Sequence, residues 1–220
     1  MRLLSLLETR ALGVLVEKAL TVPDSYPLSL NSLTLGCNQK TARDPVLNAS
    51  EGDVQLAVDG LKGLHLVFEA SGSRVTRHEH NLGRVLGLPS QSVALLAVLM
   101  LRGPQTASEL RANGERLHRF ADLSSVEGFL EELASRATEK GGALALKLPR
   151  APGSREARWT HLLSGAPAPG AADLAPGSDD FLPASELSAL KANHAILQAE
   201  VADLRRRVER LYGELGIARE

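Results

Sequence analysis

Apolar and polar positions follow the same order twice along the chain, first in residues 8–78 and again in residues 90–163. In each stretch, three segments with apolar residues three and four positions apart precede a short segment in which apolar and polar residues alternate. The first spacing predicts a helix with one buried face, and the alternation predicts a strand. Each stretch is therefore expected to form three helices followed by a two-stranded wing.

Cap signals set the expected starts of the helices in the first stretch. Ser5 and Glu8 stand three positions apart, the spacing of a capping box, in which each side chain bonds a free backbone N–H at a helix start. A second helix is expected over residues 29–37. A third, capped at its first residue, is expected over residues 50–64, and a hairpin over residues 66–77 completes the unit.

The second stretch repeats these signals. An apolar helix is expected over residues 93–101, and Thr106 with Glu109 forms another capping box at the start of the next helix. The segment 124–127, Ser-Ser-Val-Glu, is expected to open the third helix. A strand over residues 144–148 and a returning strand over residues 158–163 would form the second wing.

Three helices followed by a wing is the order of a winged-helix domain, a variant of the helix-turn-helix. The fold class we predict is mainly α with small β wings, as tandem winged-helix domains followed by a C-terminal coiled-coil helix. The first domain is assigned to residues 1–87 and the second to residues 88–165. Residues 166–183 are assigned to a linker, because twelve of the twenty residues from 164 to 183 are Ala, Pro or Gly.

A heptad pattern covers residues 184–216 and predicts a coiled coil. Leu occupies every d position and Val two of the a positions, which favours a parallel two-stranded coil and hence a homodimer. Glu200 and Arg205 fall at g and e, where they pair across such a dimer. A single amphipathic helix that folds back on its own chain is the alternative. The a and d positions are Leu187, Leu190, His194, Leu197, Val201, Leu204, Val208, Leu211 and Leu215.

Several short motifs lie between residue 1 and about residue 165. They are Leu12–Lys18, Tyr26–Asn31, Cys37–Lys40, Arg43–Val46, Leu101–Thr106, Glu109–Arg111, Glu115–His118, Leu148–Arg150 and His161–Gly165. Together these motifs resemble the YceH family of bacterial proteins. The resemblance implies a tandem winged-helix fold, and it implies no activity, because the biochemical role of that family is not established. The chain departs from the family pattern at His78, where the family usually has Tyr.

Composition narrows the class of protein. The single cysteine, Cys37, excludes an internal disulfide and fits the reducing cytoplasm, where we expect the protein to reside without a membrane anchor. The net charge is −1, and it divides into 0 for residues 1–87, +2 for residues 88–165 and −3 for residues 166–220. The strongly basic surface that usually accompanies tight nucleic-acid binding is therefore absent.

Charge also limits how duplex DNA would be bound. A winged helix commonly reads bases with its third helix, but residues 50–64 and 124–136 each carry a net charge of −2. Phosphates would repel both segments, so we expect the cations of the second wing and of the first long loop to contact phosphates instead. These candidates are Lys147, Arg150, Arg155 and Arg158 on the wing, and Lys40 and Arg43 on the loop.

Two functions follow from this pattern, and both are non-enzymatic. The one the sequence favours is a dimeric DNA-binding or transcription-regulator-like module, and the alternative is an adaptor that docks other proteins through its winged-helix surfaces. For Lys40 and Arg43 the alternative is solvated surface charge, or a contact that pins one domain to the other. No catalytic residue, cofactor or metal site is predicted, because His78, His80 and Cys37 lack a second ligand pair at zinc spacing.

Overall fold

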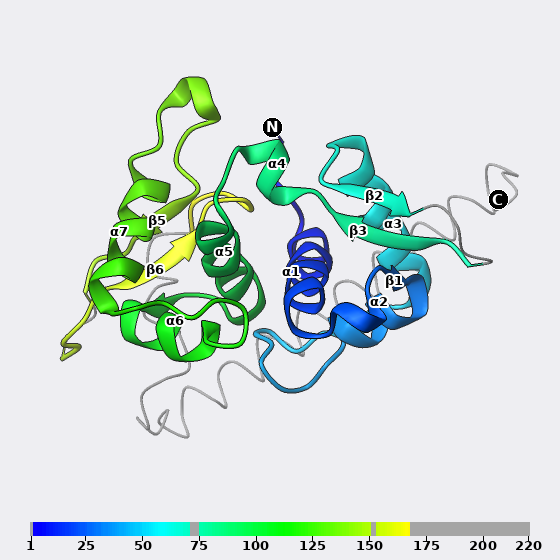
Figure 1. The fold of residues 1–220 in the computed structure, drawn as a ribbon, viewed down its shortest axis with the longest axis horizontal. Helices are drawn as coiled ribbons and strands as arrows, with labels where there is room; N and C mark the ends of the chain where they lie inside the picture. Colours follow the sequence, from blue (N-terminus) through cyan, green and yellow to red (C-terminus); the bar gives the residue numbers. More distant parts are fainter. Residues whose placement is uncertain (1, 71–74, 151–152, 168–220) are drawn as a thin grey trace, which may run out of the picture. The chain divides into compact units, whose positions relative to one another are not determined.

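The computed structural model describes residues 2–70, 75–150 and 153–167, which belong to one compact unit, residues 1–175. This part of the protein is mainly helical and carries two small antiparallel sheets (Figure 1). None of its helices is long and apolar enough to cross a bilayer. The predicted linker beyond residue 167 and the predicted coil at residues 184–216 lie outside the described residues.

The first half contains three main helices, a three-stranded sheet and two short helical segments, of which α4 leads into the second half. In chain order these elements are α1 (Leu6–Thr21), η1 (Pro23–Ser25), β1 (Leu28–Ser29), α2 (Leu30–Cys37), α3 (Glu51–Gly63), β2 (Val67–Ala70), β3 (Arg77–His80) and α4 (Leu82–Leu86). The second half repeats the order with α5 (Ser90–Arg102), β4 (Gln105–Thr106), α6 (Ala107–Gly114), α7 (Leu123–Ala134), η2 (Thr138–Lys140), β5 (Ala145–Lys147) and β6 (Arg158–His161).

The two sheets share strand order and register. The order is β1-β3-β2 in the first half and β4-β6-β5 in the second, and all pairs are antiparallel. Even a side-chain bond is repeated, since Arg77 donates to the Pro27 carbonyl at 2.8 Å and Arg158 donates to the Pro104 carbonyl at 3.3 Å. Residues of the two halves can therefore be matched by position.

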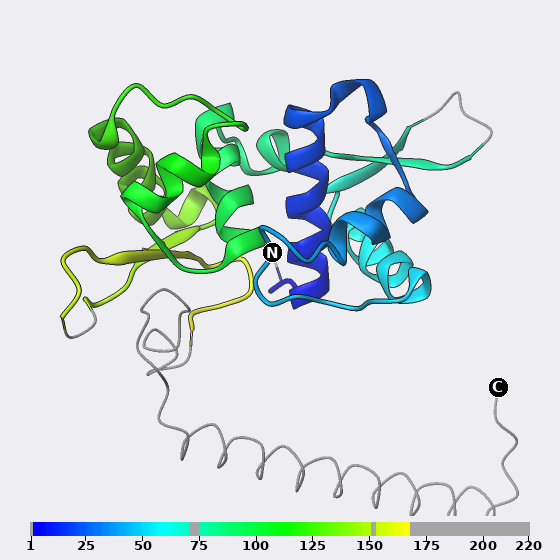
Figure 2. The same cartoon turned by 90° about the horizontal axis from the view of Figure 1, so that it is seen from below.

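Helix α1 of the first half packs against α5 of the second, and the two lie next to each other in Figures 1 and 2. Residues 8–16 of α1 and 92–101 of α5 are buried, so a continuous core joins the two halves. Gly13 permits this approach, because a Cβ at that position would lie 3.0 Å from Leu101 Cγ. The predicted boundary at residues 87 and 88 falls between α4 and α5.

The capping boxes predicted at Ser5 and Thr106 are confirmed, and so is the cap at Ser50. The third helix of the second half begins slightly before the predicted start at Ser124. Helix α7 begins at Leu123, because the Asp122 carboxylate accepts the backbone N–H of Ser125 at 2.7 Å and so caps the helix two residues before Ser124. The short strands β1 and β4 were not predicted, since two residues carry no alternation.

Candidate interaction surfaces

Arg43, one of the six predicted phosphate contacts, is turned inward. Its side chain is fully buried and donates to both carboxylate oxygens of Glu17 on α1, at 2.6 and 3.2 Å, and to the Gly36 carbonyl. A buried guanidinium with these partners is not available to a phosphate, so this prediction is corrected: Arg43 holds the loop against α1. Lys40, on the same loop, is exposed.

A second buried arginine, which the sequence did not single out, holds the same loop. Arg10 of α1 is fully buried and donates to the carbonyls of Cys37 at 3.1 Å and Pro45 at 2.6 Å. Burial lowers the pKa of its guanidinium, and the nearby Arg43 lowers it further. Its only sequence signal was a charge inside an otherwise apolar helical segment.

The loop of residues 38–50, fixed by these two arginines, also contacts the second half. The backbone N–H of Asp44 donates to the Leu101 carbonyl at the end of α5, at 2.8 Å. Asn38 closes the loop on itself, because its amide donates to the Ala49 carbonyl and accepts the Ala49 N–H, both at 2.8 Å. The loop therefore links the halves instead of forming a free surface.

The four wing cations of the second half divide into two pairs. Lys147 lies 3.5 Å from a Glu131 carboxylate oxygen and 5.2 Å from the Trp159 ring centre. Arg158 lies 3.7 Å from Glu109 and also bonds the Pro104 carbonyl. The other two, Arg150 and Arg155, are exposed and make no hydrogen bond or ion pair with any residue that the structure describes.

Trp159 lies beneath this wing as a core residue, with 1% of its surface exposed. It cannot stack on a nucleic-acid base without leaving the core. His78 occupies the matching position of the first sheet and is equally buried, because both residues pair across the sheet with the strand that precedes the second helix. The same structural position thus accepts very different side chains in the two halves.

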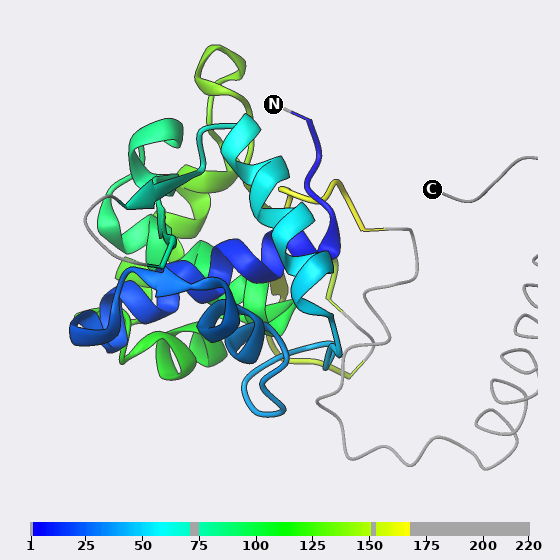
Figure 3. The same cartoon turned by 90° about the vertical axis from the view of Figure 1, so that its right-hand side faces the viewer.

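The third helices α3 and α7 expose acidic residues. Glu51, Asp53 and Asp59 are exposed on α3, where the side chain of Leu56 is also 72% exposed. Helix α3 lies in the foreground of Figure 3, which looks onto the first half. On α7 the exposed acids are Glu127, Glu131 and Glu132, and this helix contains no Lys or Arg, so its net charge is −3.

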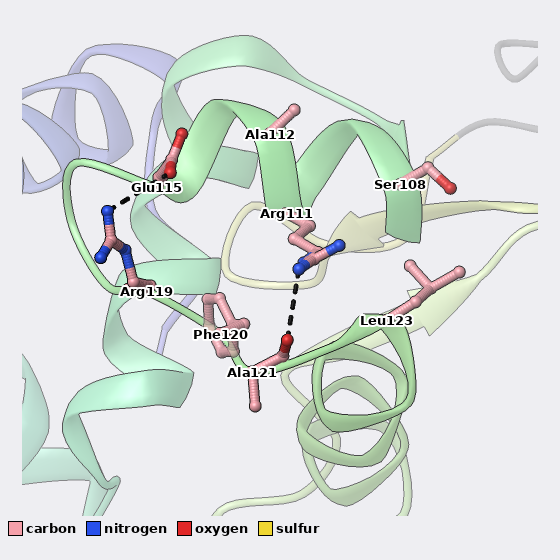
Figure 4. Close-up of a pocket in the computed structure, with 8 residues that line it drawn as sticks. All are labelled: Ser108, Arg111, Ala112, Glu115, Arg119, Phe120, Ala121 and Leu123. Atoms are coloured by element: carbon pink, nitrogen blue, oxygen red, sulfur yellow. Dashed lines mark hydrogen bonds and ion pairs between the residues drawn. The ribbon is translucent and has the colours of Figure 1, made fainter.

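A groove of about 680 Å³ lies between α6 and the chain that leads into α7 (Figure 4). Figure 4 shows Arg111 reaching from α6 to the Ala121 carbonyl, to which it donates at 3.2 Å. Arg119 lies 3.9 Å from Glu115, and both side chains are largely exposed. The lining residues are Ser108, Arg111, Ala112, Glu115, Arg119, Phe120, Ala121 and Leu123.

The histidines and the cysteine of the core do not form a metal centre. Within the described residues, no three His, Cys, Asp or Glu side chains lie close enough together to hold a metal ion. Burial raises the pKa of the Cys37 thiol to about 12, which leaves it protonated and unreactive. Burial also lowers the pKa of His80, and that of His161 to about 4, so both rings are neutral at pH 7.

One known protein family matches most of this part of the chain. The pattern of one protein family, described as "Protein of unknown function, DUF480", matches residues 4–154, which include every helix and strand up to the second wing. The chain belongs to this family. The expected resemblance to a family of uncharacterised bacterial proteins is thereby confirmed.

Relatives in other bacteria are similar over almost the whole chain. A UPF0502 protein of Methylibium petroleiphilum is 63% identical over 218 residues, covering 99% of this chain and 92% of the relative. One from Leptothrix cholodnii is 61% identical over 96% of this chain and 94% of the relative, and one from Burkholderia pseudomallei is 59% identical over 99% and 91%. The similarity therefore extends past residue 165, where the resemblance to the YceH motifs was expected to end.

Proposed function

We propose that this protein is a non-enzymatic tandem winged-helix module whose main activity is to dock other proteins. The sequence favoured DNA binding, with protein docking as the alternative. The observation that reverses this order is the exposure of the acidic residues on both third helices, whose net charges are −2 on α3 and −3 on α7, together with the burial of Arg43, one of the predicted phosphate contacts. A helix with this charge is repelled by DNA phosphates but not by a protein surface.

The repeated architecture supports the winged-helix assignment. Each half has a helix, a short strand, two further helices and two paired strands, and the short strand joins the sheet beside the last strand. This is the order of a winged-helix domain. Such a domain places its third helix and its wing at the surface, where both are able to contact a partner.

A salt series with random duplex DNA tests the proposal. A docking protein with acidic third helices is expected to bind the duplex weakly at low salt and not at all at physiological salt. Micromolar affinity that falls steeply as salt rises would contradict the proposal, because that dependence is produced by multiple phosphate contacts.

Phosphate binding by the second wing is the other candidate function, and the exposure of Arg150 and Arg155 without described partners favours it. Under this alternative, the double variant Arg150→Glu, Arg155→Glu would weaken DNA binding to the same extent for every duplex sequence. It would also flatten the dependence of affinity on salt, because two phosphate contacts are lost.

The proposal includes a cytoplasmic, parallel homodimer formed through residues 184–216, for which the heptad pattern is the support. Two copies held together bind a repeated partner with avidity. The Leu204→Asp variant places a charge at a d position and is expected to give monomers in light scattering. A persistent dimer would assign self-association to another part of the chain.

A further inference from the structure

The groove between α6 and α7 has a counterpart in the first half, and the two can be compared residue by residue. Thr106 and Ser29 are the N-caps of α6 and α2, and Asp122 and Ser50 are the N-caps of α7 and α3. Counting from these caps matches each lining residue of the groove with one residue of the first half.

In the first half a hydrogen bond bridges the starts of the two helices. The Asn31 amide at the start of α2 donates to the Glu51 carboxylate at the start of α3, at 2.8 Å. In the second half the matching residues are Ser108 and Leu123, which cannot form that bond because leucine has no polar group. The starts of α6 and α7 therefore remain unbridged by this pair, and both residues line the groove.

The backbone groups of the residue before each cap are also bonded differently in the two halves. Ala49 and Ala121 are matching residues, one position before each cap. Asn38 satisfies both the carbonyl and the N–H of Ala49, whereas the Ala121 carbonyl receives one bond from Arg111. No other hydrogen bond or ion pair joins Arg111 to a described residue, so most of its N–H donors face the groove or solvent.

The chemistry of the lining defines the ligand class. Leu123 provides apolar surface, to which Phe120 adds little because it is 5% exposed. Figure 4 shows the guanidinium of Arg111 directed at the Ala121 carbonyl and that of Arg119 directed at Glu115. Glu115 offsets Arg119 only weakly, because their side chains are 66% and 87% exposed at 3.9 Å. A volume of about 680 Å³ lies in the range of ligand sites.

We infer that the α6–α7 groove binds a peptide segment of a partner protein that combines an acidic residue with a large apolar side chain. Arg111 and Arg119 each offer a carboxylate of the segment a charge-assisted hydrogen bond. The apolar side chain packs on Leu123. This inference rests on the proposed docking function and adds the site and the partner's chemistry.

The test begins with a displayed library of random short peptides, selected on the purified full-length protein. Peptides in which Asp or Glu lies near Leu, Ile or Phe are expected to be enriched. The affinity of an enriched peptide is then measured by fluorescence anisotropy on variants of the protein. Arg111→Glu and Arg119→Glu are each expected to weaken binding by about tenfold or more, which is about 1.4 kcal/mol.

Two controls make the test specific. Arg116→Glu changes an exposed cation of the same turn that does not line the groove, and is expected to leave the affinity within about threefold of that of the unchanged protein. A peptide with Lys in place of its acidic residues should bind Arg111→Glu better than the unchanged protein. Thermal unfolding checks that each variant is folded.

Failures of the site and of the function give different results. Selected peptides that bind the Arg111→Glu, Arg119→Glu double variant as tightly as the unchanged protein would overturn the site and leave the docking function standing. Enrichment of Lys-rich peptides, or no enrichment, would overturn the inference. Steeply salt-dependent DNA binding that Arg111→Glu abolishes would overturn both the inference and the docking function.

Discussion

The turn between the second and third helices differs between the two halves. In the first half it spans residues 38–50 and is held by Arg10 and Arg43, while in the second half it spans residues 115–122 and carries exposed arginines. The first turn bonds the end of α5, and the second borders an open groove. The turns of the two copies of this architecture therefore differ: the first is bonded to the interior, and the second lies at the surface beside the groove.

The difference arises from the length of the turn, which is five residues greater in the first half (13 residues) than in the second (8), and from a few polar side chains, because the sheets of the halves match. Asn38 ties the first turn, and Asn31 bridges the starts of α2 and α3. Glu115 and Ser108 stand at the same positions in the second half, where they pair with Arg119 and Glu156 instead. The arginines near the two turns also differ in their surroundings, since Arg43 is paired in the interior and Arg111 remains at the surface. Charge counts alone do not separate these two roles.

Of the variants that test the difference between the two turns, removal of Arg43 should lower the free energy of unfolding most. The Arg43→Met variant leaves the Glu17 carboxylate without its buried partner, and breaking such a pair lowers the free energy of unfolding by about 3–5 kcal/mol. Urea denaturation measures this loss. Lys40→Met, an exposed change on the same loop, should stay within about 0.5 kcal/mol. An equal, small effect of both variants would show that the loop is not held from inside.

A smaller effect is expected from the matched pair of turn variants. Asn38→Ala removes both bonds to Ala49 and should lower the free energy of unfolding by about 1–3 kcal/mol. Arg111→Ala removes one exposed bond to Ala121 and should change it by less than about 0.5 kcal/mol. Chemical denaturation of both variants checks the difference, and a larger loss for Arg111→Ala would invert the assigned roles.

Acid should lower the stability of the protein through a histidine of the second wing. His161 is half-buried, and the burial of its ring lowers its pKa to about 4, while the unfolded chain has an ordinary histidine pKa of about 6.5. The unfolded state therefore takes up a proton first, and stability falls as pH drops from about 6.5 towards 4. Because the residue is partly exposed, we expect a loss of about 1–2 kcal/mol between pH 7 and pH 5.

The His161→Phe variant keeps the ring and removes the titration, so its stability should change less over that range in urea denaturation. His80→Phe is the matched variant in the first half, where burial also lowers the histidine pKa. Both Nδ1 atoms are buried without a hydrogen-bond partner in the described residues. An unchanged pH dependence in His161→Phe would assign the acid sensitivity to other groups.

The periodic pattern predicted the longer helices, three caps and both wings, because those elements depend on spacing and on residues close in sequence. It did not predict the short helix α4, and it placed the start of α7 too late. It did not predict that Arg43 lies inside, since its partner Glu17 is 26 positions away and only the folded chain brings them together. The groove was missed for the same reason. Arg119 and Leu123 lie in no motif of the sequence, Arg111 lies in one that carries only the family resemblance, and the three line one groove only when α6 packs beside α7.

Amide hydrogen exchange at Ala49 and Ala121, followed by NMR in the free protein, tests most directly whether the first turn is locked and the second open. The Ala49 N–H donates to Asn38, and the matching Ala121 N–H bonds no described residue. We expect exchange at Ala49 to be slower by about a hundredfold or more, relative to the rates of the unfolded chain. Equal protection at the two positions would contradict the division between a supporting half and a binding half.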